Sequence, residues 1–223
     1  MGVVTILPST TSHPITRIGE RAGVCWGADT SDPEKNYKRG LDCITSGHGR
    51  TLEFVNVEMV LDGYSARVIR EWYTHIGGAP TRLQASTRYI DYGKFDYVIP
   101  DTVRRNEAAA RVYVPAMQAI STAVAELENL GVPREDAALL LPLGMTTRIV
   151  DKRNLRNLID MSRQRMCVRA YWEFREMFDD ILCALEGESD EWQEVIDMTM
   201  HAKCTELGYC PEKHGCGKYN GRS

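Results

Sequence analysis

The stretch from residue 150 to residue 187 constrains the fold most, because its apolar residues recur with the period of an α-helix. It reads VDKRNLRNLIDMSRQRMCVRAYWEFREMFDDILCALEG. Asp151 stands where a helix N-cap is expected. The stripe that would face a core consists of Leu155, Leu158, Ser162, Met166, Ala170, Phe174, Phe178 and Ile181. The pattern predicts one long helix from Asp151 to Leu185.

The polar residues of this predicted helix fall on a face of their own. Asn154 and Arg165 are three helical turns apart and lie nearly in line, and Arg156 and Asp160 share an adjacent line at i and i+4. Such a face is either solvated or the wall of a polar pocket. Exposed Arg/Asp pairs at this spacing are common and weak, so spacing alone favours the solvated face.

A second informative stretch, THIGGAPTRLQASTRYIDY, covers residues 74–92. The preceding pattern predicts a helix from about 65 to 76, with Ser65 as its cap, His75 in its last turn and Gly77-Gly78 as its end. The following residues are rich in hydrogen-bond donors: Thr81, Arg82, Gln84, Ser86, Thr87 and Arg88. They suit a loop that binds an anion such as phosphate. A polar surface hairpin fits the composition equally well.

The rest of the chain mixes strands and helices. Strands are predicted at residues 3–6, from Glu53 to Met59 with an end at Asp62-Gly63, and at residues 95–100. Residues 29–40 are expected to form polar turns. A helix is predicted from Asp101 to Leu130, kinked or divided at Pro115.

Composition excludes several classes of protein. The 223 residues carry a net charge of −4, which disfavours general nucleic-acid binding because that requires a basic face. Neither a basic-plus-apolar leader nor a run approaching the roughly 18 apolar residues of a membrane span is present, so we expect no membrane partner and a cytoplasmic location. The 43% apolar content is sufficient for a core.

The C-terminal segment has a cysteine pattern but no core-forming pattern. Seven cysteines are an odd number for a disulfide framework, so reduced thiols or a metal site are expected. Cys204, Cys210 and Cys216 recur every six residues beside His201 and His214, a ligand set that suits tetrahedral zinc. The spacing differs from that of a zinc knuckle, and plain thiols remain the alternative. We expect one domain over residues 1–200 and a Cys-rich tail over residues 201–223.

Several motifs occur together in a characteristic order. They are SGHGRTLEF before a strand, REWYTHI at a helix end, STRY, GVPRED, and NLRNL followed by AYWEFRE. In order and spacing this set, over about residues 42–185, resembles the flavin-dependent thymidylate synthases. The resemblance implies an α/β fold with a mixed central sheet and long helices, and a homotetramer whose active sites are shared between subunits. It also implies methylation of dUMP to dTMP with methylenetetrahydrofolate as carbon donor, NADPH as reductant and FAD as hydride carrier.

The resemblance also implies roles for particular residues. The residues at flavin-contacting positions are His48, Arg50, His75, Asn154, Arg156 and Asp160. Those at nucleotide-contacting positions are Glu71, Gln84, Ser86, Arg88 and Arg165. Arg165 addresses the pyrimidine, and together with His75 it is expected to be catalytic. No nucleophilic cysteine is expected, because reduced flavin carries the difficult chemistry.

The chain departs from the family pattern at several positions. The Arg-His-Arg signature reads Thr74-His75-Ile76, the following loop is about two residues longer, and Ala138 stands where a phosphate-binding arginine is common. Arg82 and Arg50 are the candidates to replace the lost charge. These changes keep two alternatives open: one-carbon transfer to another pyrimidine nucleotide, and a noncatalytic flavin- or nucleotide-binding module. A zinc-tailed nucleic-acid binder is a third, which the acidic charge disfavours.

Overall fold

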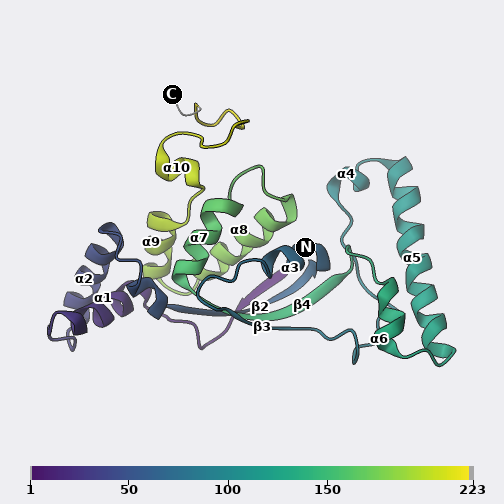
Figure 1. Cartoon of the computed structure of the whole chain (residues 1–223), viewed down its shortest axis with the longest axis horizontal. Coiled ribbons are helices and arrows are strands. Elements are labelled where there is room, and N and C mark those ends of the chain that lie inside the picture. Colours follow the sequence, from purple (N-terminus) through teal and green to yellow (C-terminus); the bar gives the residue numbers. More distant parts are fainter. Residues whose placement is uncertain (1, 221–223) are drawn as a thin grey trace. The chain divides into compact units, whose positions relative to one another are not determined.

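The computed structural model describes residues 2–220. Within them, the strands form an antiparallel four-stranded sheet in the order β1-β2-β4-β3 (Figure 1). The strands are β1 (Val3–Ile6), β2 (Asn56–Ser65), β3 (Thr81–Gln84) and β4 (Thr146–Asn154). Alternate residues of β2 and β4 are buried, as expected for strands with one covered face. The predicted class, strands combined with long helices, is confirmed.

The chain divides into two compact units. The first unit contains Leu61–Tyr73 and Leu83–Ile149, together with the first residues of the chain. The second unit contains Val4–Val60, Thr74–Arg82 and the chain from Val150 onward. Among the described helices, none combines the length and the apolar character that a membrane span requires.

The first unit is built around one long helix. Its helices are α3 (Ala66–Trp72), α4 (Asp101–Arg104), α5 (Glu107–Asn129) and α6 (Arg134–Ala137), followed by a 3₁₀ turn (Ala138–Leu140). One buried cluster lies beside α5 and consists of Tyr92, Phe95, Met117 and Met145. Other apolar side chains of this unit face solvent, including Val112, Leu130 and Leu139.

The second unit holds most of the helices. They are α1 (Pro14–Cys25), α2 (Pro33–Thr45), a 3₁₀ helix (Thr51–Phe54), α7 (Leu155–Arg165), α8 (Trp172–Glu186), α9 (Asp190–Thr199) and α10 (Lys203–Leu207). Helices α1 and α2 approach closely because glycine stands at their crossing. A Cβ at Gly19 would lie 1.8 Å from the carbonyl oxygen of Asn36, and one at Gly40 would lie 2.0 Å from that of Ile15.

The prediction of one helix from Asp151 to Leu185 is wrong. Strand β4 runs through Asn154, α7 ends at Arg165, and residues 166–171 separate it from α8. Asp151 is no N-cap: its side chain is fully buried in an ion pair with Arg153, which allows a charged sequence to form an interior strand. Asn154 is the cap, because its side chain accepts a hydrogen bond from the backbone N–H of Asn157.

The predicted boundaries around α3 also change. Ser65 is the N-cap as predicted, accepting from the backbone N–H of Val68, but the helix ends at Trp72 and His75 lies beyond it. Strand β2 begins at Asn56 and passes through Asp62-Gly63 to Ser65. Gly63 has a φ of +77°, a left-handed conformation that glycine adopts readily, and the strand continues past the end that was predicted there.

Three further predictions are corrected. Residues 29–40 include the first part of α2, which Asp32 caps. Pro115 lies inside α5 without dividing it, and the break falls before Asn106, the α5 cap. The strand predicted at residues 95–100 is reduced to a single bridge between Tyr97 and Met145.

Candidate active site

The start of α7 packs against the turn formed by Gly77 and Gly78. A Cβ at Gly78 would lie 2.3 Å from Nδ2 of Asn154, and one at Gly77 would lie 2.9 Å from Nδ2 of Asn157. Gly78 also has a φ of +71°. Only glycine meets both requirements, so the backbone turn is held directly against two asparagine side chains.

A cavity of about 240 Å³ opens at this contact. We call it the glycine cavity, and it is lined by Glu53, Gly77, Gly78, Asn154, Arg156, Asn157 and Asp160. Arg156 donates from Nη1 to Oε1 of Glu53 at 2.6 Å. The structure therefore brings together three of the predicted flavin-binding residues, Asn154, Arg156 and Asp160. Their face of α7 is a pocket wall rather than a merely solvated face.

The loop that carries two more predicted flavin-binding residues lies against Arg156. A Cβ on Gly49 would be 3.6 Å from the Arg156 guanidinium. His48 and Arg50, on either side of Gly49, are both exposed. Gly47 and Gly49 line a second cavity of about 600 Å³, to which Arg156 and Asp160 also contribute.

A fully buried ion pair lies next to the glycine cavity. Arg153 donates from Nε and Nη2 to the two carboxylate oxygens of Asp151, at 2.5 and 2.7 Å. Its Nη1 donates to Oδ1 of Asn157 at 2.6 Å. Burial lowers the pKa of Arg153, and the hydrogen bonds to Asp151 oppose that shift. Removing one partner would leave a buried charge alone, at a cost of about 3 to 5 kcal/mol.

The two residues predicted to be catalytic meet at the other end of α7, where Arg165 of this helix contacts His75. Arg165 donates from Nε to Nε2 of His75 at 2.9 Å. Its guanidinium carbon lies 4.6 Å from the centre of the Phe174 ring, and His75 meets that ring edge-on at 5.7 Å. Burial first, and then the charges of Arg165 and Arg153, lower the pKa of His75 to about 4. His75 is thus neutral at pH 7, with Nε2 as acceptor and the proton on Nδ1.

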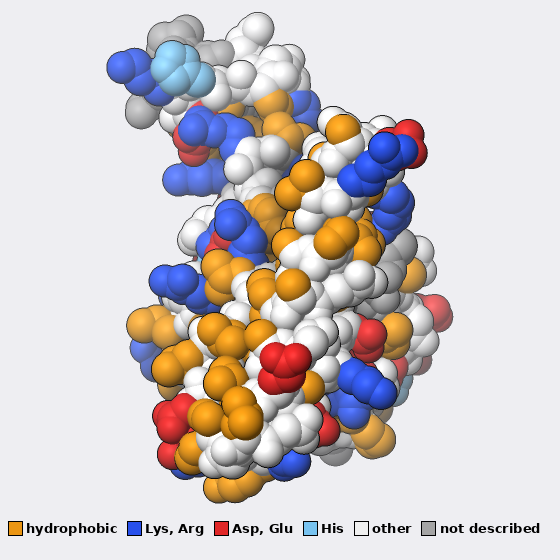
Figure 2. Space-filling view, turned by 90° about the vertical axis from the view of Figure 1, so that its right-hand side faces the viewer, with side chains coloured by type: hydrophobic (Ala, Val, Ile, Leu, Met, Phe, Trp, Pro, Cys, Tyr) orange, Lys and Arg blue, Asp and Glu red, His pale blue; other side chains and the backbone are white. Residues whose placement is uncertain are grey.

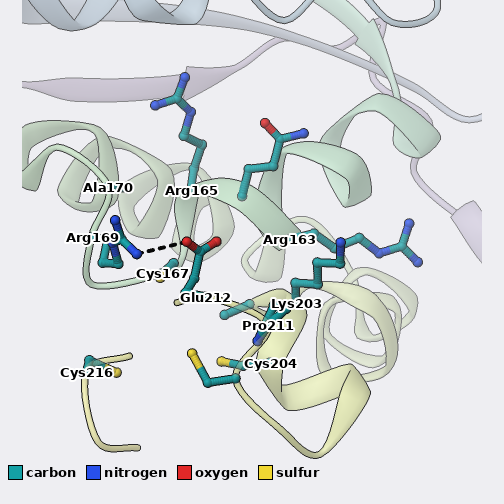
Figure 3. A pocket seen from close by; sticks show the side chains of 13 residues that line it. Arg163, Arg165, Cys167, Arg169, Ala170, Lys203, Cys204, Pro211, Glu212 and Cys216 are labelled. Carbon is teal, nitrogen blue, oxygen red and sulfur yellow. Dashed lines mark hydrogen bonds and ion pairs between the residues drawn. The ribbon is translucent and has the colours of Figure 1, made fainter. Parts of the chain in front are cut away.

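Arg165 also borders a larger cavity, of about 590 Å³, between the end of α7 and the tail. Two ion pairs attach the tail there: Arg163 with Glu206, and Arg169 with Glu212. In Figure 3, Arg169 reaches Glu212, whereas the Arg165 side chain points away from Cys216. The wall also includes Cys167, Cys204 and Cys210.

The predicted zinc ligands line this tail cavity but do not form a ligand cluster. Among residues 2–220, no three His, Cys, Asp or Glu side chains are grouped so that they could hold a metal ion. Cys204, Cys210 and Cys216 are free thiols, and Cys216 is exposed. Zinc binding by the tail stays a prediction.

The remaining predicted nucleotide-binding residues belong to the first unit. Ser86 accepts through Oγ from the backbone N–H of Arg88, whose guanidinium lies 5.3 Å from the Tyr89 ring centre. Gln84 donates from Nε2 to the Thr147 hydroxyl at 3.4 Å. Glu71 is half-buried on α3. Ser86 and Arg88 share a turn, and strand β3 separates it from the Gly77-Gly78 turn, so residues 77–88 are not one continuous loop as predicted.

Sequence reasoning missed Asn157, Phe174 as a partner of Arg165, and the Asp151–Arg153 pair. One signal was present for Asn157: it follows Asn154 by three residues, the spacing at which an N-cap side chain meets the helix backbone. The ion pair gave no usable signal, because VDKRN has the polarity of an exposed helix start.

Comparisons with known proteins identify the family of the chain. The family model described as thymidylate synthase complementing protein matches residues 7–188, and the chain belongs to this family. The flavin-dependent thymidylate synthase of Nitratidesulfovibrio vulgaris is 31% identical over 186 residues, which are 79% of this chain and 74% of that protein. That of Thermococcus onnurineus is 32% identical over 198 residues, 83% of this chain and 78% of that protein. The predicted family resemblance is confirmed.

A solved structure shares the fold. The crystal structure of the UMP/dUMP methylase PolB from Streptomyces cacaoi, bound with 5-Br dUMP, superposes with a TM-score of 0.73. The match covers 90% of this chain and 96% of that chain at 17% sequence identity. At this identity the likeness shows a common fold.

Proposed function

We propose that the protein is a FAD-dependent methyltransferase that converts dUMP to dTMP, with methylenetetrahydrofolate as carbon donor and NADPH as reductant. The observation that carries the proposal is the contact between Arg165 and a neutral His75, at positions where the family places its pyrimidine-directed arginine and its signature histidine. The flavin-dependent relatives support the class of reaction.

The glycine cavity fits part of a flavin dinucleotide. The start of α7 carries a partial positive charge, and Arg156 and the asparagine amino groups add donors that suit a diphosphate. Asn154, Arg156 and Asp160 would hold the cofactor there, with His48 and Arg50 on the neighbouring loop. Bound FAD, once reduced, supplies the hydride, and the protein binds, orients and excludes water.

Arg165 is the residue that activates the pyrimidine. Carbon 5 of uracil is a poor nucleophile, so a site that uses it must stabilise negative charge as it develops on the ring, and a fixed guanidinium does so electrostatically. The Nε group of Arg165 is engaged by His75. Phe174 packs against the same guanidinium and restricts its movement. Because His75 is neutral, it accepts this hydrogen bond, whereas a protonated imidazole would repel the arginine.

The nucleotide phosphate is proposed to bind the turn at Ser86 and Arg88. Arg88 is exposed and offers a planar pair of donors that matches a phosphate group. Glu71 and Gln84 are proposed to contact the same nucleotide. Burial is the main cause that lowers the pKa of Arg153, and the charge of Arg82 adds a smaller effect in the same direction, so Arg82 lies near the buried pair. Arg82 is the alternative phosphate ligand. Loss of binding in Arg82→Ala, with normal binding in Arg88→Lys, would favour that alternative.

We also propose a homotetramer. Hydrophobic side chains are exposed on the face seen in Figure 2, and within the first unit Val112 of α5 is 73% exposed. In a homotetramer, neighbouring subunits would cover such exposed apolar side chains. Light scattering at micromolar concentration should give the mass of four chains, and a monomer would contradict the proposal.

A second substrate is favoured by one observation. Thr74 and Ile76 replace the two signature arginines, so the pyrimidine nucleotide can differ from that of the relatives. The fold neighbour is described as a UMP/dUMP methylase, which makes UMP the alternative substrate.

Tritium release from carbon 5 tests the proposed function. The purified protein is given FAD, NADPH and methylenetetrahydrofolate with 5-tritiated dUMP, UMP or dCMP in separate reactions. We expect release from dUMP, less from UMP and none from dCMP. Faster release from UMP would favour the second substrate. Bound FAD without release from any pyrimidine would indicate a noncatalytic binding module.

A further inference from the structure

The two asparagines at the start of α7 both have their side-chain oxygen engaged by a protein donor. Oδ1 of Asn154 accepts from the backbone N–H of Asn157 at 2.9 Å. Oδ1 of Asn157 accepts from Nη1 of Arg153 at 2.6 Å. A carboxamide has one oxygen and one amino group, so fixing the oxygen also fixes the direction of the amino group. The amino groups of Asn154 and Asn157 therefore face Gly78 and Gly77, respectively.

Neither amino group is used within the protein. In residues 2–220, Nδ2 of Asn154 and Nδ2 of Asn157 donate no hydrogen bond to another residue. Asn157 is only 4% exposed, yet among the described residues only Nε of Arg175 is a fully buried side-chain atom without a partner. Nδ2 of Asn157 is thus open to the glycine cavity, which this residue lines. A nearly buried donor without a protein partner is stabilised when a ligand supplies an acceptor.

The buried ion pair prevents Asn157 from turning its amide over. A flipped amide would place Nδ2 against Nη1 of Arg153, two donors facing each other, and would leave Nη1 with the weak sulfur acceptor of Met161 alone. Arg153 is in turn fixed by its two bonds to Asp151. The donor direction is therefore set before any ligand arrives, which reduces the ordering cost of binding.

We propose that Asn157 is a ligand-binding residue, which donates from Nδ2 to a phosphoryl oxygen in the glycine cavity beside Asn154, and that Arg153 is its positioning residue. A phosphoryl group offers only acceptors, as two adjacent amino groups require. The guanidinium of Arg156, although paired with Glu53, and the positive end of α7 favour the same anionic group, and they act against the carboxylates of Glu53 and Asp160 that line the same cavity. This inference rests on the proposed function in one respect: the phosphoryl group is assigned to the diphosphate of FAD.

The substitution Asn157→Asp tests the donor. The carboxylate keeps the size of the side chain and still accepts from Arg153, but it has no amino group to donate. We expect the Kd for FAD to rise roughly tenfold or more, as for a lost hydrogen bond to a charged group. Riboflavin, which lacks phosphate, should bind the variant and the wild type equally. Gln164→Glu adds the same charge at the other end of α7 and should leave the Kd for FAD within twofold.

Two further variants distinguish the loss of an amino-group donor from a general loss of folding. Asn154→Asp keeps a good N-cap but loses its amino group, so it should weaken FAD binding similarly. Arg153→Lys adds no charge to the cavity and releases the Asn157 amide, so it should weaken FAD binding in the wild type but not in an Asn157→Asp background. Thermal unfolding without FAD monitors folding, and a variant that unfolds at the assay temperature is replaced by one of the others.

The outcomes separate this inference from the proposed function. If the wild type binds no FAD, the proposed function fails and the inference fails with it. If the wild type binds FAD and Asn157→Asp binds it within twofold, only the role of Asn157 is overturned. Equal weakening of FAD and riboflavin by Asn157→Asp would overturn the assignment to the diphosphate.

Discussion

Two turns flank strand β3, and they differ in what holds their donors in place. The glycine turn, residues 77–79, packs against Asn154 and Asn157, whose orientations are fixed by a helix cap and a buried ion pair. The serine turn, residues 86–90, is stabilised by hydrogen bonds within itself, from the N–H of Arg88 to Ser86 and from that of Ile90 to Ser86. Its side chains are mostly exposed.

The difference matches two kinds of ligand. Donors fixed in advance bind with a small entropic cost and suit a cofactor that stays bound through many turnovers. An exposed arginine on a short turn is ordered only when its ligand arrives, which suits a substrate that must leave after each cycle. Under the proposed function, the flavin would bind at the glycine turn and the nucleotide phosphate at the serine turn, with the chemistry at Arg165.

The largest effect is expected for Arg165→Ala, which removes the guanidinium proposed to stabilise charge on the pyrimidine. The rate of tritium release from dUMP should fall about 100- to 1,000-fold, as for loss of one electrostatic donor. FAD binding, monitored by the flavin absorption band, should be retained because both turns are intact. A loss of less than tenfold would remove Arg165 from the chemistry.

Gly78→Ala should disrupt the close packing of the glycine turn against Asn154 and so weaken FAD binding. The new Cβ would lie 2.3 Å from Nδ2 of Asn154, at a φ of +71°. We expect at least a tenfold rise in the Kd for FAD and a loss of about 1 to 2 kcal/mol in the free energy of unfolding. Gly131→Ala is the matched control, since Gly131 has a φ of +86° and nothing within 4 Å of its added Cβ. It should lose only the part of the stability that comes from the positive φ and keep FAD affinity; equal FAD affinity in both variants would contradict the close packing.

The pH dependence tests the neutral state of His75. Its pKa is lowered to about 4, so activity should stay constant from about pH 8 to 5 and decline near pH 4, where protonation breaks the Arg165 contact. His75→Gln still accepts from Arg165 without titrating, and it should lose this acidic limb. A decline in wild-type activity near pH 6.5 would show that the pKa of His75 is not lowered.

The same shift links pH to stability. Because the folded pKa of His75 lies below its ordinary value of 6.5, the unfolded chain binds more protons between about pH 4 and 6.5. The contribution of neutral His75 is complete above 6.5 and declines as the pH falls toward 4. Urea unfolding across this range should show a smaller decline in His75→Gln than in the wild type.

The smallest effect is expected in the C-terminal tail, which is rich in potential metal ligands, and it concerns the rates of thiol labelling. Because no ligand cluster is preformed within residues 2–220, thiol labelling should follow exposure: Cys25, Cys183 and Cys216 fast, Cys43 and Cys210 slow. A chelator should leave these rates unchanged. Labelling of Cys204, Cys210 and Cys216 that starts only after chelation, with about one zinc per chain, would restore the predicted zinc site.

The sequence predicted the family better than it predicted the boundaries of the elements. The motif order identified the family and assigned Asn154, Arg156 and Asp160 to one site, and these three residues line one cavity. It did not predict the end of β4, because a buried Asp151–Arg153 pair has the same local pattern as an exposed helix start. That pair is enclosed by tertiary packing and stabilised by its own hydrogen bonds, and neither propensity nor periodicity encodes such packing.

The serine and glycine turns illustrate the same limit. Gly77, Gly78, Ser86 and Arg88 were grouped in one loop because they are close in the sequence and share donor chemistry. The pairing of β3 with β4 separates them. Such pairing depends on residues far away in the sequence, as in the contact between Gln84 and Thr147, which are 63 positions apart, so local composition cannot reveal it.

The most direct test of the two-turn assignment is a crossed measurement on Arg156→Ala and Arg88→Lys. Arg156→Ala should raise the Kd for FAD about tenfold and, with saturating FAD, leave the KM for dUMP within twofold. Arg88→Lys keeps the charge but loses the planar pair of donors, so it should raise the KM about tenfold and leave the Kd for FAD within twofold. Weakened FAD binding in Arg88→Lys, or a raised KM without any change in FAD binding in Arg156→Ala, would contradict the assignment.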